Sequence, residues 1–373
     1  MRKIFLIPLV SMLFFCCSSG KKSSKEYMLL DSVIYAHSIQ KLETLCEDSM
    51  ILVTTSIPYI KNFAIIDSLL FVDTNQENGQ LNILSINGIK SYGALLDKGR
   101  GRGEFGYGIH LTLYTTFEHL KDSLYANLYD LMGGRLYRIN ITKQVTEGEC
   151  HIQEIILSEE LPRSAFWAKT ISDTLVFLKS IDHMETRQTR SIITKNGRVL
   201  TNVTDKMNEL EIPAKEDFNL ISSLIAFSES NNMFVEAMIG MNYINIYSLQ
   251  KDKGITVCIG RDLDKLSTIL STPKFERKYV FADLRTYNFG FAVLKYDIEE
   301  KAYQSHESFH PSILMFDWNG NPIGEIASEL TFNHFDIDVN NGYLYILDKD
   351  GRLLKKRFTA APQKKDLSFV NSF

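Results

Sequence analysis

The segment Asp67-Ser68-Leu69-Leu70-Phe71-Val72 decides the fold, because the same pattern of a polar turn and an apolar β run recurs along the chain. The other copies are Asp122-Ser123-Leu124-Tyr125-Ala126, Asp173-Thr174-Leu175-Val176-Phe177-Leu178, Asn231-Asn232-Met233-Phe234-Val235, Tyr287-Asn288-Phe289-Gly290-Phe291-Ala292-Val293 and Asn341-Gly342-Tyr343-Leu344-Tyr345-Ile346. The turn positions 67, 122, 173, 231, 288 and 341 are separated by 55, 51, 58, 57 and 53 residues. A period near 50 is typical of four-stranded propeller blades, so the sequence predicts an all-β, six-bladed β-propeller over residues 31–361.

Each blade is expected to be an antiparallel meander. Several copies are followed by a further β run that ends in an Asn-Gly pair, at Asn87-Gly88, Asn196-Gly197 and Asn319-Gly320. Such pairs supply the positive φ that tight hairpins require. The short stretches 207–210 and 262–270 are expected as small helical insertions.

The last copy leaves room for three strands where four are needed. We expect the segment Asp31 to Leu45 to supply the missing outer strand of the last blade, so that an N-terminal strand closes the ring. Closure removes a free sheet edge that would otherwise promote aggregation. The alternative is a linker followed by a five-bladed or sandwich domain.

Composition limits the functional classes. Of the 373 residues, 45% are hydrophobic and 23% are charged, which excludes collagen, a disordered chain and a polytopic membrane protein. The formal net charge of −4 does not favour a phosphate backbone, so nucleic acid is not expected as a partner.

The N-terminus has the features of an export signal. Arg2-Lys3 precede an apolar run, residues 4–15, that is shorter than the ~20 residues needed to span a bilayer. The exit at Cys16-Cys17 resembles a bacterial lipobox, so we expect residues 1–17 to be a lipoprotein signal with Cys17 acylated, or Cys16 in the alternative register. Residues 18–30 would be a flexible tether and 362–373 a polar tail. A lipid would be the sole membrane contact, on an outer-membrane lipoprotein facing the periplasm. A plain signal peptide is the other interpretation.

The stretch Gly99-Arg100-Gly101-Arg102-Gly103-Glu104-Phe105 resembles a motif of the TolB-like six-bladed β-propeller lipoproteins. Members of that family commonly carry Gly-x-Gly-Pro-Gly-Glu-Phe at the exit of the first blade, and here Arg102 stands in place of the proline. The resemblance implies a fold similar to NHL and TolB propellers and a lipid anchor. It implies no activity, because most members have none assigned.

Two loops hold the candidate binding residues. Arg100 and Arg102 could grip a carboxylate or phosphate, with Glu104 in the same loop; alternatively the glycines simply allow a turn. The segment from His306 to His310 matches the H-E-x-x-H motif of zinc-binding helices. Pro311, however, disfavours helical geometry at His310, so no metal is expected. If the strand count holds, the loops 99–105 and 297–311 lie on one face of the ring.

The sequence favours a non-catalytic binding or scaffolding module for an envelope protein, a peptide or a glycan, with no cofactor. The alternative is a propeller enzyme, a hydrolase or lyase acting on a saccharide, lactone or ester at the mouth of the central channel. A third interpretation is a purely structural envelope component. Convergent Asp, Glu or His side chains at the ends of the inner strands would favour the enzyme.

Overall fold

The structure is a computed structural model of the chain. It describes residues 26–53, 57–74, 76–101, 103–157, 161–162, 164–172, 175–182, 187–194, 196–213, 216–305 and 307–358.

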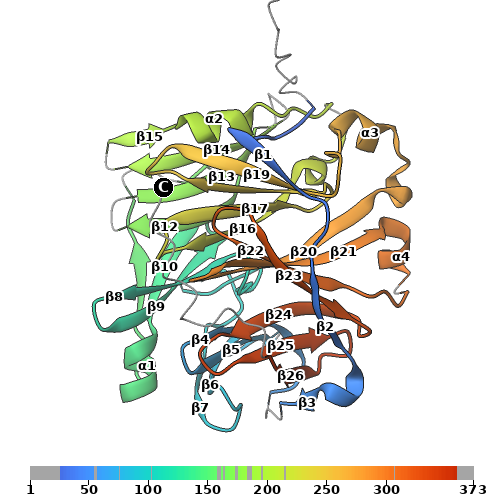
Figure 1. The fold of residues 1–373 in the computed structure, drawn as a ribbon. Helices are drawn as coiled ribbons and strands as arrows, with labels where there is room; N and C mark the ends of the chain where they lie inside the picture. The colour runs from blue at the N-terminus through green and yellow to red at the C-terminus, as the bar shows by residue number, and fades with distance from the viewer. Residues whose placement is uncertain are drawn as a thin grey trace, which may run out of the picture.

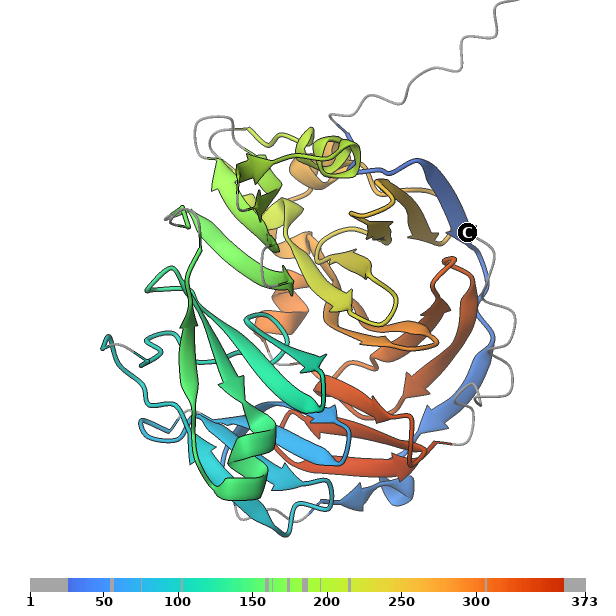
Figure 2. The ribbon, with the colours of Figure 1, turned by 90° about the vertical axis from the view of Figure 1, so that its left-hand side faces the viewer.

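The described residues form six sheets arranged in a ring, as predicted (Figure 2). We number them as blades 1 to 6 in chain order. Their strands, inner to outer, are β4 (Ile60–Ile66), β5 (Leu69–Thr74), β6 (Leu81–Ser85) and β7 (Ser91–Leu95) in blade 1; β8 (Thr115–Leu120), β9 (Ser123–Asp130), β10 (Arg135–Asn140) and β11 (Ile152–Ile155) in blade 2; β12 (Ala165–Ser172), β13 (Leu175–Asp182), β14 (Arg187–Thr194) and β15 (Gly197–Val199) in blade 3; β16 (Ser223–Ser228), β17 (Met233–Met238), β18 (Tyr243–Ser248) and β19 (Lys253–Ile259) in blade 4; β20 (Lys278–Tyr287), β21 (Gly290–Glu299), β22 (Ser312–Asp317) and β23 (Pro322–Ser328) in blade 5; and β24 (Phe332–Asp338), β25 (Tyr343–Asp348) and β26 (Leu353–Arg357) in blade 6.

The repeated polar turns join the first and second strands of each blade rather than opening it. The turn residues Asp67 and Asn232 adopt φ of 55° and 51°, which short polar side chains tolerate better than most. The Asn-Gly pairs join the third and fourth strands, where Gly88, Gly197 and Gly320 have the expected positive φ of 75°, 104° and 80°. The repeat in the sequence therefore has the length of one blade, but each copy starts at the second strand of a blade rather than at the first.

The N-terminal segment runs along the outside of three blades, which corrects the prediction that Asp31 to Leu45 closes the last blade. β1 (Ser32–Ala36) pairs in parallel with β19, and β2 (Lys41–Leu45) pairs in parallel with β23, so each adds a fifth strand to a complete sheet. The strand that closes blade 6 is β3 (Ile51–Leu52), which pairs antiparallel with β26. We call residues 32–52 the strap; it follows the outer edge of blades 4, 5 and 6 (Figures 1 and 2).

Helices are short insertions between strands. Those in the described residues are α1 (Ile141–Glu147), α2 (Asn202–Asn208), α3 (Leu266–Ser271), α4 (Glu300–Gln304) and the 3-10 turns η1 (Glu47–Ser49), η2 (Phe218–Ile221) and η3 (Lys274–Glu276). α2 and α3 fall where helical insertions were expected. No helix within this set has the length or apolar character that crossing a bilayer requires.

Apolar clusters between neighbouring blades form the core, as alternating strand residues require. Blades 3 and 4 are also joined by a polar network. Glu236 on β17 accepts hydrogen bonds from Arg190 Nε at 3.0 Å and Nη2 at 2.8 Å, and from Tyr247 OH at 2.8 Å, while Lys179 Nζ lies 3.4 Å away. With Ser223, these residues are buried and form what we call the blade 3/4 network.

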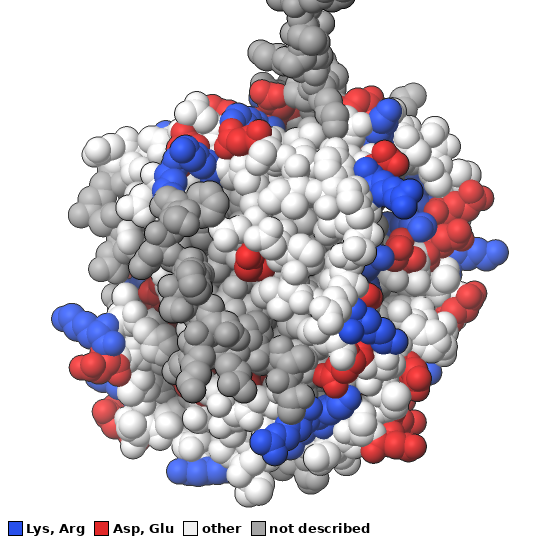
Figure 3. All heavy atoms as spheres, viewed as in Figure 1, with Lys and Arg blue, Asp and Glu red and all other residues white. Residues whose placement is uncertain are grey.

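Surface charges are mixed. On the face shown in Figure 3, Lys and Arg side chains lie among Asp and Glu side chains, mostly around the edge of the view, and form no continuous positive stripe.

Candidate functional site

A central cavity of about 930 Å³ occupies one end of the ring axis. Its wall is formed by the C-terminal halves of the inner strands β4, β16, β20 and β24, with the turns that follow them, by β8 and by Lys169 of β12. Because these strand ends converge on one mouth, the inner strands all run toward the same face. The volume is in the range of small-ligand sites.

The wall combines aromatic rings with polar groups. Phe117, Phe227, Tyr287 and Phe289 supply flat apolar surfaces, and the turns at the mouth supply amides and hydroxyls. The polar side chains that line the cavity include Asp67, Thr115, His119, Lys169, Glu229, Ser230, Arg285, Asn288, Asp336, Asp338, Asn340 and Asn341.

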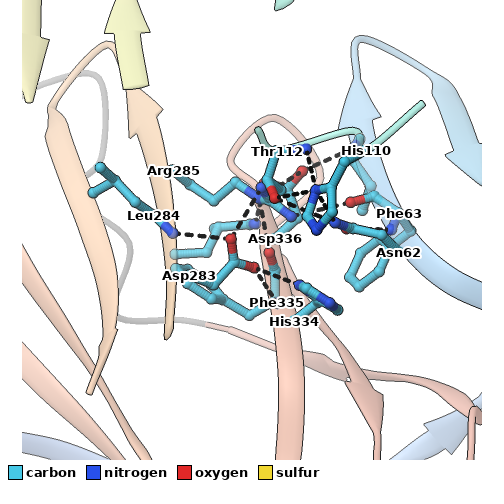
Figure 4. Close-up of polar contacts among 12 residues, drawn as sticks. Asn62, Phe63, His110, Thr112, Asp283, Leu284, Arg285, His334, Phe335 and Asp336 are labelled. Atoms are coloured by element: carbon cyan, nitrogen blue, oxygen red, sulfur yellow. Dashed lines mark hydrogen bonds and ion pairs between the residues drawn. The ribbon is translucent and has the colours of Figure 1, made fainter. Parts of the chain in front are cut away.

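A buried hydrogen-bonded cluster borders the cavity (Figure 4), and we call it the floor network: Asn62, His110, Thr112, Asp283, Arg285, His334 and Asp336. Three of its members, Thr112, Arg285 and Asp336, also line the cavity. Arg285 joins three blades, since it donates to Phe335 O and Phe63 O at 3.0 Å each and lies 3.3 Å from Asp283 Oδ1. Its fixed partners make it part of the frame rather than a group free for a ligand.

The carboxylates of the floor network are fully engaged. Asp336 accepts hydrogen bonds from Ile65 N at 2.7 Å, Ile337 N at 2.8 Å and Tyr287 OH at 3.0 Å. Burial raises the pKa of Asp336 above its ordinary value, although the Arg285 charge opposes the shift. For Asp283 burial also acts upward, but the Arg285 charge and the His334 hydrogen bond outweigh it and hold the pKa below its ordinary value.

His110 is a neutral member of the floor network. Burial, reinforced by the neighbouring His334, lowers its pKa to about 3. Asn62 Nδ2 donates to His110 Nδ1 at 3.2 Å, and Thr112 Oγ1 lies 3.0 Å from the same nitrogen. An acceptor role for Nδ1 places the ring proton on Nε2. Asn62, His110 and Thr112 position the inner strands, and of these three only Thr112 also lines the cavity.

One side of the mouth holds groups that are open to solvent. His119 Nε2 lies 3.0 Å from Asp67 Oδ2, and their side chains are 56% and 58% exposed. The backbone amide of His119 donates to Glu229 Oε2 at 3.2 Å, so blades 1, 2 and 4 meet there. Asp338 is different, because both its oxygens accept hydrogen bonds from Asn341 within its own turn.

Lys169 is the unusual group of the wall. Its residue is 4% exposed, yet it lines the cavity, with Nζ 5.0 Å from the centre of the Phe227 ring. Among the described residues, no hydrogen-bond or ion-pair partner of Nζ is found. Burial lowers the pKa of Lys169 to about 8, against the opposing charges of Glu118 and Glu229. Glu118 is itself paired with Arg138 Nη2 at 2.7 Å.

Of the predicted site residues, Arg100, Glu104 and His310 do not line this cavity. Arg100 and His310 are exposed, and Glu104 folds back to accept a hydrogen bond from Gly101 N at 2.8 Å. Phe105 is buried against Tyr137, in agreement with the turn-forming interpretation of this loop. Arg102, His306, Cys16 and Cys17 lie outside the described residues.

The loops 99–105 and 297–311 do share one face. The first joins blades 1 and 2, and the second joins β21 to β22, so both lie where the inner strands begin. The cavity opens where those strands end. The two loops therefore occupy the face opposite the mouth. In the described part of the chain, no three His, Cys, Asp or Glu side chains are grouped to hold a metal ion.

The repeated sequence motif contains several polar residues of the mouth, namely Asp67, Asn288 and Asn341. His119 precedes the Asp122 turn by three residues, and Glu229 precedes the Asn231 turn by two, so distance from the turn could have identified both as mouth residues. Lys169 carries no such signal, because it sits inside an ordinary β run.

Comparisons with known proteins agree with the fold. No family model matches the sequence, and no curated protein matches it. A solved member of the DUF4221 family from Bacteroides vulgatus is 12% identical, with a TM-score of 0.51 over 87% of this chain and 97% of that one. A Bacteroides fragilis protein described as exported is also 12% identical, with a TM-score of 0.48 over 87% and 98%. A periplasmic gluconolactonase from Pseudomonas aeruginosa is 11% identical, with a TM-score of 0.40 over 82% of each chain. The fold is a six-bladed β-propeller with neighbours among exported proteins.

Proposed function

We propose that this protein is a lipid-anchored, periplasm-facing binding module of the TolB-like propeller type, and that its ligand is a glycan whose end enters the central cavity. The observation that carries the proposal is a cavity of about 930 Å³ that opens at one face and is lined by aromatic rings and polar side chains. Such a volume suits a few sugar units or a chain terminus rather than a flat protein surface.

The chemistry of the wall supports a saccharide over an apolar ligand. Sugar hydroxyls both donate and accept hydrogen bonds, and the mouth offers acceptors at Asp67 and Glu229 together with amides at Asn288 and Asn340. The ring faces of Phe117 and the other aromatic residues can cover the apolar side of a sugar ring. Peptide and protein partners are the competing outcomes.

A glycan and peptide screen with the full-length chain in detergent tests this proposal. Phe117→Ala and Asp67→Asn should each weaken binding of any captured glycan, about tenfold or more. Arg100→Ala, on the opposite face, is the matched control and should leave binding unchanged. Capture that survives both cavity variants but is lost in Arg100→Ala would overturn the cavity as the site and favour the loop face.

The anchor is tested separately. Metabolic labelling with a fatty acid should mark the wild-type chain, and Cys17→Ser should abolish the label while Cys16→Ser retains it. Labelling that depends on Cys16 instead would move the processing site by one residue. A chain that takes up no label would be a plain secreted protein.

A hydrolase or lyase is the second candidate, because His119, Asp67 and Glu229 converge on one side of the mouth. A histidine paired with a carboxylate can act as a general base. If the protein turns over a saccharide, lactone or ester, His119→Ala should lower kcat by about 10²–10⁴-fold with little change in binding. A screen in which no such substrate is consumed would leave the binding module as the better account.

A further inference from the structure

Lys169 is a buried cation that has no ion-pair partner among the described residues. The described carboxylates that act on its charge are Glu118 and Glu229, and neither forms an ion pair with it. Arg138 already neutralises Glu118, and Glu229 accepts the His119 amide. An unpaired buried ammonium group is costly, so folded proteins rarely keep one without use.

A second buried lysine, Lys179, differs from Lys169 because it has polar partners in the protein. Lys179 is also fully buried, but it lies 3.4 Å from Glu236 and 2.7 Å from Ser223 Oγ, inside the blade 3/4 network. Lys169 instead lines a solvent-connected cavity, with its Nζ over the face of the Phe227 ring. A structural role therefore explains Lys179 and leaves Lys169 unexplained.

A second unsatisfied group lies in the same wall. Thr115 on β8 lines the cavity, and its buried Oγ1 has no hydrogen-bond partner among the described residues. An ammonium group without a partner among the described residues, in the wall of a cavity that also holds an unsatisfied hydroxyl, is the kind of group that binds a carboxylate.

We infer that Lys169 is the anion-binding residue of the central cavity, and that the ligand carries a carboxylate, as in a uronic-acid-bearing saccharide. This inference rests on the proposed glycan-binding function and narrows it to acidic sugars. The ligand carboxylate would accept a charge-assisted hydrogen bond from Nζ in a site largely shielded from water. Sugar hydroxyls would then face the aromatic wall and the amides of the mouth.

The source of the carboxylate follows from the cavity walls. The C-terminus of a peptide could offer the same charge, but its backbone needs matched donors and acceptors in a row. The wall instead offers scattered amides and carboxylates beside flat rings, which suit a sugar. Peptide binding is therefore an outcome that would count against the inference.

The test uses the full-length chain in detergent and matched ligand pairs. Binding of oligogalacturonate is compared with that of neutral galacto-oligosaccharide, and an oligoalanine peptide with a free C-terminus is compared with its amidated form. The acidic saccharide should bind, and Lys169→Met should weaken it about 10- to 100-fold, the range of a charge-assisted hydrogen bond. Lys169→Arg should recover part of the affinity, and Lys90→Met, at an exposed lysine over Tyr92, should have no effect.

The pH dependence of affinity provides a further readout. A carboxylate binds the protonated amine, so affinity should be constant between about pH 5 and 7, where the ligand carboxylate is ionised and Lys169 is protonated, and should decline above about pH 8 as Lys169 loses its proton. This decline should be absent in Lys169→Met. Unfolding temperatures of each variant, measured in parallel, identify any variant that fails to fold, and Lys169→Arg then carries the comparison.

The outcomes distinguish the role of Lys169, the identity of the ligand and the proposed function. Equal binding of neutral and acidic saccharides, unaffected by Lys169→Met, would overturn the role of Lys169 and leave the glycan module standing. Lysine-dependent capture of the free peptide alone would overturn the sugar as ligand. Failure of every ligand in the panel, after the broader screen has also failed, would overturn the proposed function and this inference together.

Discussion

Replacing Glu236 by Gln should destabilise the ring at the junction of blades 3 and 4. The side chain is fully buried, and its two oxygens receive hydrogen bonds from Arg190, Lys179, Ser223 and Tyr247. Burial alone would raise the pKa of this carboxyl group, but the charges of Arg190 and Lys179 hold it well below its ordinary value. The variant keeps the shape of the side chain and removes the negative charge between two cations.

The expected loss is about 3–5 kcal/mol, the usual cost of removing one partner of a buried ion pair. With an unfolding entropy near 2.1 cal/mol/K per residue, a ring of this size would unfold about 4–7 °C earlier if it unfolds as a unit. Burial and the Arg190 charge lower the pKa of Lys179 to about 7, so the measurement belongs near pH 6, where this lysine keeps its charge. Differential scanning calorimetry reports the midpoint directly.

Two further variants separate the charge effect from general damage. Glu236→Gln combined with Lys179→Met should recover part of the loss, because a single buried cation then remains. Lys278→Met removes an exposed pair in which Nζ lies 2.9 Å from Asp297 Oδ1, and should cost less than 1 kcal/mol. A Glu236→Gln midpoint within about 1 °C of wild type would refute the view that this network holds the two blades together.

Two other stability predictions follow from buried groups. Burial raises the pKa of Asp73 to about 7, against the charge of Lys61, and neither carboxylate oxygen has a hydrogen-bond partner among the described residues. Because the pKa of Asp73 is higher in the folded than in the unfolded protein, the free energy of unfolding should decline as the pH rises from about 4 to 7. Asp73→Asn should therefore raise the free energy of unfolding by about 2–4 kcal/mol at pH 8 and have little effect at pH 4. An effect of equal size at both pH values would show that ionisation of the buried Asp73 carboxyl group is not the reason. Gly290→Ala would place Cβ 1.9 Å from Phe316 O at φ 152°, so its unfolding midpoint should fall well below that of Gly134→Ala, where φ is 62° and the space is open; equal midpoints would show that the backbone at Gly290 adjusts freely.

The number of blades was predictable because each blade repeats the same turn chemistry. The residues that begin the second strand follow a polar turn whose backbone often needs positive φ, as at Asp67 and Asn232. That requirement leaves a visible mark in the sequence. The closure of the ring left almost none, because β3 is two residues long and its pairing with β26 depends on distant contacts.

The site was less accessible to sequence reasoning. The loops 99–105 and 297–311 were predicted as binding loops because a glycine-rich stretch and a pair of histidines match known sequence motifs. Lys169 could not be identified from the sequence, because its lack of an ion-pair partner depends on contacts between distant residues. Glu118 is paired with Arg138, and the ring next to Lys169 Nζ belongs to Phe227 of the next blade. Burial and the absence of a partner are properties of the assembled ring.

The strap also sets the order in which the molecule can be completed. The first described strands find their partners more than 200 residues later, in β19, β23 and β26. A nascent chain that emerges N-terminus first must keep these segments unpaired until nearly the whole polypeptide is available. Contacts of such long sequence separation slow folding. Final assembly is therefore a late event, and a ribosome that stalled within blade 5, before β23, would release a product in which β2 and β3 still lack their partner strands.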